Sequence, residues 1–97
     1  MRREEFKKWM LKKKRIYCGK EGTYSESAVE SRIGYLIRLE THFKLNLDSK
    51  VVDEQTAIQF LKDIREAHIE DLRHTPLSNA FRHYYEFSTG LYINKIF

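Results

Sequence analysis

The hydrophobic and polar positions along the chain predict a helical protein without strands. Apolar residues recur every three or four positions over four segments, which is the period of an amphipathic helix. The predicted helices cover residues 3–17, 26–43, 54–67 and 76–89. Residues 18–24 contain two glycines and show no periodicity, so they are predicted to form a loop. The expected fold class is therefore all-α, a small bundle of four or five helices.

Residues that favour helix ends support these boundaries. Thr23 or Ser25 can cap the second helix, because a hydroxyl oxygen accepts a hydrogen bond from the free amides of a first turn. Asp53 is placed to cap the third helix in the same way. Thr75 is expected to cap the fourth helix, with the proline that follows it at the first helical position, and Gly90 is expected to end it.

Size and composition fit one domain, residues 1–97. A chain of 97 residues with 41% hydrophobic residues can bury a core but is too short for separate binding and catalytic lobes. No apolar run approaches the roughly 20 residues that span a bilayer, so we expect no membrane contact and a cytoplasmic location. The single cysteine, Cys18, has no partner for an internal disulfide or a paired zinc site.

Positive charge is concentrated at the start of the chain. The first 20 residues contain nine lysines and arginines and two glutamates, a net charge of +7, whereas the whole chain carries +4, which leaves −3 for the other 77 residues. Such a field is typical of contact with a polyanion, and nucleic acid becomes the leading partner. The alternative is a lysine-rich helix with a solvated face.

Small polar side chains line one face of the predicted second helix. Ser27, Ser31, Gly34 and Arg38 follow each other at spacings of four, three and four, which places small residues beside a cation. This face could approach a phosphate backbone closely, or it could simply face solvent. On the predicted fourth helix, Arg82 and its neighbours Asn79, His83 and Glu86 are expected to point away from the apolar stripe.

No catalytic or metal site emerges from the sequence. The letters of Leu72-Arg73-His74-Thr75 also occur in the catalytic box of tyrosine recombinases, but Glu70 stands where that box has a histidine, and no nucleophile segment follows. His68, Asp71 and His74 share a spacing of three, which is a weak metal signal that exposed side chains explain more simply. We therefore expect neither an enzyme nor a cofactor.

Four segments resemble one family over nearly the whole chain. The segments "FKKWML", "TYSESAVESRIGYLIRLE", "AIQFLKDI" and "NAFRHYYEF" are similar to the SAM-like core-binding domain of tyrosine recombinases and phage integrases. The resemblance implies a bundle of four or five helices that clamps one side of double-stranded DNA, while a separate domain carries the catalytic residues. It implies phosphate contacts with weak sequence preference.

The resemblance places DNA at the start and polar face of the second helix, with a contribution from the fourth. The residues that it implicates are Lys20, Ser25, Ser27, Ser31, Arg38 and Arg82. Lys12, Lys14 and Arg15 are additional basic residues that extend this contact or remain solvated.

Two alternatives remain open at this stage. The apolar end "LYINKIF", Leu91 to Phe97, is expected to pack on the bundle or on a partner, which would be another protein in a helical protein interaction module or a missing C-terminal catalytic domain. Similar domains are also fused to other DNA-processing proteins such as restriction-type nucleases, so the parent protein need not be an integrase.

Overall fold

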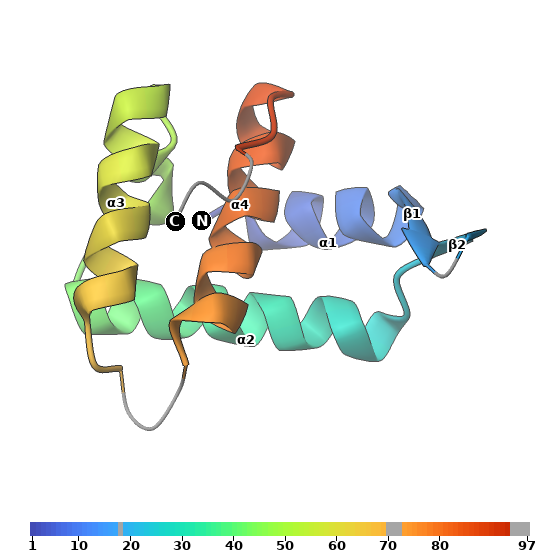
Figure 1. Cartoon of the computed structure of the whole chain (residues 1–97), viewed down its shortest axis with the longest axis horizontal. Helices are drawn as coiled ribbons and strands as arrows, with labels where there is room; N and C mark the ends of the chain where they lie inside the picture. The colour runs from blue at the N-terminus through green and yellow to red at the C-terminus, as the bar shows by residue number, and fades with distance from the viewer. Residues whose placement is uncertain (18, 70–72, 94–97) are drawn as a thin grey trace.

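The computed structural model describes residues 1–17, 19–69 and 73–93, and these form a mostly helical domain with one small hairpin (Figure 1). Its elements, in chain order, are α1 (Arg3–Lys12), β1 (Lys14–Tyr17), β2 (Lys20–Thr23), α2 (Glu26–Phe43), the 3-10 helix η1 (Leu47–Lys50), α3 (Glu54–Glu66) and α4 (His74–Thr89). Among the described residues, no helix combines the length and the apolar character needed to cross a membrane.

The longest helix, α2, forms the base on which the other helices pack. α3 and α4 stand side by side across it, and α1 lies alongside it (Figure 1). Aromatic side chains join the helices, since the Phe6 ring of α1 meets the Tyr84 ring of α4 at 5.4 Å and Phe60 of α3 meets Phe81 of α4 at 4.9 Å. All four of these side chains are buried. One continuous core therefore fixes the four helices relative to one another.

The first helix is shorter than the sequence predicts, and a hairpin follows it. α1 ends at Lys12 instead of Tyr17, and the residues expected to form a loop contribute the antiparallel strand β2. The register pairs Tyr17 with Lys20, so the turn has two residues, and Gly19 supplies the positive φ of 78° that such turns favour. Isoleucine and tyrosine in β1 favour strands, which explains why the helical period does not decide this segment. The expectation of a protein without strands was wrong.

The helix ends confirm most of the predicted caps. Ser25 caps α2 by accepting a hydrogen bond from the Ala28 amide at 3.1 Å, and Asp53 caps α3 through the Thr56 amide at 2.7 Å. Gly90 ends α4 with a left-handed φ of 79°. The prediction for the start of α4 was wrong, because the helix begins at His74 and its N-cap residue makes no side-chain capping bond.

Two faces also differ from the helical pattern. On α2, the helical spacing of the apolar residues predicts that Ile37 is buried, but Ile37 is 38% exposed and Leu39 is buried instead. On α4, every residue from Ala80 to Tyr85 is buried, so Arg82 and His83 do not face solvent as expected. The reason is that α4 contacts α1, α2 and α3, and a helix packed by three neighbours buries more than one stripe.

Candidate nucleic-acid interface

Most of the basic residues singled out in the sequence lie at one end of the molecule. The end of α1, the hairpin and the start of α2 lie together there, far from α3 (Figure 1). Lys12 and Lys14 are exposed at this basic end, and Arg15 on β1 is half-buried. Lys20 lies on β2, but its side chain falls outside the described part of the structure. The hairpin thus brings strand residues beside the first turn of α2, which a helix running to Tyr17 would not do.

The serines of α2 take different roles at this basic end. Ser25 is exposed and uses its oxygen to cap the helix, which leaves its hydroxyl hydrogen free to donate. Ser27 is also exposed, and its backbone N–H group lies in the first turn, where it has no carbonyl partner within the helix. Ser31 donates its hydroxyl hydrogen to the Ser27 carbonyl oxygen at 3.1 Å, so this hydroxyl can only accept unless it rotates. The donors for an anion are therefore concentrated in the first turn.

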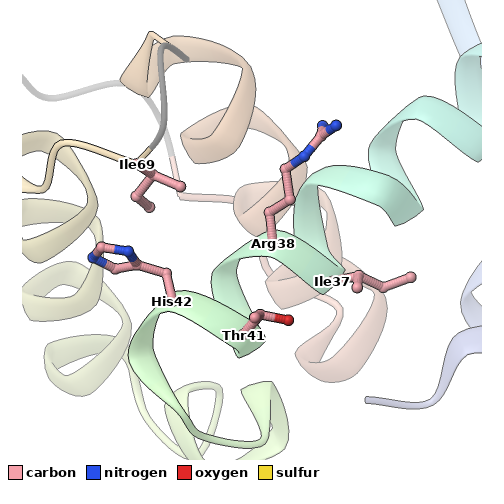
Figure 2. Close-up of a pocket in the computed structure, with 5 residues that line it drawn as sticks. All are labelled: Ile37, Arg38, Thr41, His42 and Ile69. Carbon is pink, nitrogen blue, oxygen red and sulfur yellow. The ribbon is translucent and has the colours of Figure 1, made fainter.

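Arg38 lies on the same exposed face but farther along α2. Eleven residues separate it from Ser27, which corresponds to about 16 Å of helix. Its guanidinium group is 5.9 Å from the Tyr35 ring, and its side chain borders a shallow pocket of about 320 Å³ that Ile69 also lines. Figure 2 shows Arg38 and His42 projecting from α2 in different directions, with Ile69 beside His42. Arg38 therefore does not belong to the basic end.

Arg82 is the clearest departure from the expected interface. The residue is only 3% exposed, and its Nη1 atom donates to the Asn79 Oδ1 atom at 3.0 Å. Its Nε atom is buried without a hydrogen-bond partner in the structure. Burial lowers the pKa of Arg82, with the charge of Tyr92 acting in the opposite direction. The expectation that this side chain points away from the core was therefore wrong, and in this structure it is not presented to a phosphate backbone.

The nearby carboxylates are engaged by other lysines. Lys7 of α1 forms ion pairs with Glu30 at 2.7 Å and Glu26 at 3.6 Å, and its hydrogen bond with Glu30 raises the pKa of Lys7 and lowers that of Glu30. Lys13 pairs with Glu86 of α4 at 2.9 Å. These acidic groups are therefore partly neutralised by Lys7 and Lys13.

Two further residues, Tyr24 and Arg32, belong to this region and were missed. Arg32 follows Ser31 on α2 and donates to the Ala28 carbonyl oxygen at 3.2 Å, and its guanidinium group lies 4.7 Å from the centre of the Tyr24 ring. Arg15 reaches the same ring at 4.7 Å. The contact between Arg15 and Tyr24 depends on the hairpin, so the helical spacing of residues in the sequence could not predict it.

The remaining chemical signals of the sequence lie around the start of α4. Arg73 and His74 are exposed at the start of α4, where the chain enters a helix, while Asp71 and Leu72 lie outside the described residues. Within the described ranges, no group of three or more histidine, cysteine, aspartate and glutamate side chains could hold a metal ion.

Comparison of the chain with protein-family models, with curated proteins and with solved structures found no match. Its function must therefore be inferred from its own residues and their geometry.

Proposed function

We propose that this chain is a non-catalytic DNA-binding domain that contacts the phosphate backbone of double-stranded DNA through its basic end. The observation that carries the proposal is the meeting of exposed Lys12 and Lys14 and half-buried Arg15 with the capped start of the 18-residue helix α2. The first-turn amides and the positive end of the helix dipole favour an anion at the same place as the cations. Ser25 and Ser27 add hydroxyl donors there.

The proposal includes a place in a larger protein. The resemblance of the four sequence segments supports a SAM-like core-binding domain that clamps DNA for a tyrosine recombinase or phage integrase, with catalysis in a separate domain. An N-terminal domain of another DNA-processing protein, such as a restriction-type nuclease, would use the same surface. In either setting this chain supplies affinity and position, and the reaction is performed elsewhere.

A specific observation favours one competing function, a helical protein interaction module. Leu91 is 65% exposed and Tyr92 is 48% exposed directly after α4. Because Leu91 and Tyr92 are adjacent, they could form part of a contiguous apolar patch of the kind that partner proteins contact. Ile93, the next residue of this apolar end, is buried in the core at 6% exposure, and residues 94–97 lie outside the described residues. In this function the lysines of α1 would serve solubility, and DNA affinity would be absent.

The deciding experiment is fluorescence anisotropy with a labelled duplex of about 20 base pairs at several salt concentrations. Replacing Lys12 and Lys14 together by alanine should weaken binding about tenfold, and it should reduce the slope of log K against log salt by about 2, since each phosphate contact contributes about 0.9. The matched control replaces Lys62 and Arg65, two exposed cations of α3, by alanine.

This control should change the affinity no more than about twofold, because α3 lies at the opposite side of the molecule (Figure 1). Equal losses for the two double variants would contradict the proposed interface. No binding by the unaltered chain at low salt would reject DNA binding and favour the protein interaction module.

A further inference from the structure

Tyr24 connects three elements near the basic end. It lies between β2 and the N-cap of α2, and its ring has the guanidinium groups of Arg15 and Arg32 each 4.7 Å from its centre. Its hydroxyl oxygen is 3.3 Å from Nε2 of His83 on α4, and the two rings meet edge to face at 5.7 Å. The ring is thus held by α4 while it contacts one cation from the hairpin and one from α2.

This arrangement places two like charges close together. Each guanidinium carbon lies 4.7 Å from the centre of the Tyr24 ring, so the two carbons are at most twice this distance apart. Two positive charges at this separation repel each other in a partly buried setting. Within the described ranges Arg32 has no carboxylate at ion-pair distance, in contrast to Lys7 and Lys13. Its Nε atom is buried and has no hydrogen-bond partner in the structure. An anion beside Arg32 would compensate its charge.

Arg32 also lines a hollow of about 220 Å³ between α2 and α4. Its other lining residues are Tyr35 of α2 and Thr75, Pro76 and Asn79 of α4. Among the described residues no carboxylate lines it, and Arg73, the N-cap residue of α4, makes no side-chain capping bond to the first turn.

Asn79 lines this hollow and can add a donor to it. Its Oδ1 atom accepts a hydrogen bond from Arg82, which leaves its amide NH₂ group to donate elsewhere. The hollow therefore combines a guanidinium group, a hydroxyl, an amide donor and a helix start, which is a set of groups suited to a phosphate oxyanion.

We infer that this hollow is a second phosphate contact for duplex DNA, in which Arg32, positioned by the Tyr24 ring, donates to a backbone phosphate together with Thr75 and Asn79. The inference rests on the proposed function and extends the interface from the hairpin to the start of α4. Arg32 keeps N–H groups for this purpose, since only its Nη1 atom is engaged, with the Ala28 carbonyl.

The first test replaces Arg32 by methionine, which keeps the length of the stem and removes the guanidinium group. We expect duplex binding to weaken about five- to tenfold and the salt slope to fall by about 1, which is the effect of one lost phosphate contact. Arg65→Met is the matched control on α3 and should change the affinity no more than about twofold. If Arg32→Met behaves like this control while the unaltered chain binds DNA, the inference fails and the proposed function stands.

The second test separates the ring of Tyr24 from its hydroxyl group. Tyr24→Phe keeps the ring that contacts both arginines and should bind DNA like the unaltered chain, whereas Tyr24→Leu should lose about as much affinity as Arg32→Met. Thermal melting of both variants shows whether the fold is kept. Equal losses of affinity for phenylalanine and leucine would reject the ring as the group that positions Arg32.

The source of the phosphate is tested by NMR on the Arg32 side-chain Nε signal. Duplex DNA should shift this signal at micromolar concentrations, and inorganic phosphate at matched ionic strength should leave it unchanged up to the millimolar range. A shift with inorganic phosphate but none with DNA would overturn the assignment to a DNA phosphate.

Discussion

His83 is a histidine that α4 keeps away from water. It is 8% exposed, and burial lowers its pKa to about 4, helped by the positive charge of Arg32 and opposed by the negative charge of Glu86. In the folded protein the His83 imidazole is therefore neutral at pH 7. In the unfolded chain the pKa of this histidine is about 6.5. Between these two pKa values the unfolded chain binds more protons than the folded protein, so lowering the pH favours unfolding.

This difference predicts a loss of stability in mild acid. The contribution of neutral His83 to the free energy of unfolding is fully present above about pH 6.5 and is lost as the pH falls towards about 4, a loss on the order of 2 kcal/mol. Urea unfolding at pH 7, 5.5 and 4.5 measures it. His83→Gln should flatten this part of the pH profile, whereas a change at exposed His42 to glutamine should not. Parallel profiles for the unaltered chain and His83→Gln would contradict the prediction.

Arg82 shows why the type of a residue does not by itself predict a DNA contact. Its side chain has the charge that the interface needs, but the chain buries it to 3% exposure. We expect Arg82→Met to change duplex affinity less than about twofold, because no accessible guanidinium group is lost. Its stability should be similar or higher, since a buried cation without a carboxylate partner within the described ranges costs desolvation energy.

Anisotropy and thermal melting check both statements on Arg82. A tenfold loss of affinity with an intact fold would place Arg82 back at the interface.

At the level of elements, the start of α2 can be tested separately from the stability of the helix. Aspartate caps a helix about as well as serine, and its charge suits the positive end of the dipole. Ser25→Asp should therefore leave the melting temperature unchanged or slightly higher, while its negative charge at the proposed phosphate site weakens DNA binding at least about threefold. Ser25→Asn, a neutral cap, is the control. If the aspartate and asparagine variants bind DNA equally, the first turn of α2 does not face phosphate.

The elements also show what the sequence could and could not predict. The limits of α2 at Glu26 and Phe43 follow from a serine cap and a long apolar period, and both are local signals. The hairpin depends on cross-strand pairing between β1 and β2, and its residues continue the apolar spacing of α1 well enough to suggest a longer helix. Arg15 could be placed near Tyr24 only once this pairing was known.

The same limit applies to the candidate site. Helical spacing correctly grouped Ser27, Ser31 and Arg38 on one exposed face, because spacing within a single helix is local information. It did not identify Arg32, whose surroundings come from the hairpin and from α4. Nor did it predict that Arg82 is buried, because that depends on how many neighbours α4 has.

In the whole molecule, positive charge is concentrated at one end of the fold. The first 20 residues carry a net charge of +7, and they form α1 and most of the hairpin, while the remaining residues carry −3 and include all of α3. α3 and the hairpin lie at opposite sides of the molecule (Figure 1). A duplex approaching at low salt is therefore attracted to the basic end before any specific contact forms.

This polarity predicts the outline of the bound surface. In an amide chemical-shift titration with a short duplex, signals of residues 12–35 and 73–79 should move and should return as salt is raised, because phosphate contacts exchange with counterions. Signals of α3, residues 54–66, should stay in place. Leu91 should also stay unperturbed, since it is none of the residues proposed to contact DNA. Shifts centred on α3 would reject the polarity argument, and shifts confined to Leu91 and Tyr92 would show that the exposed apolar residues, rather than the cations, bind the ligand.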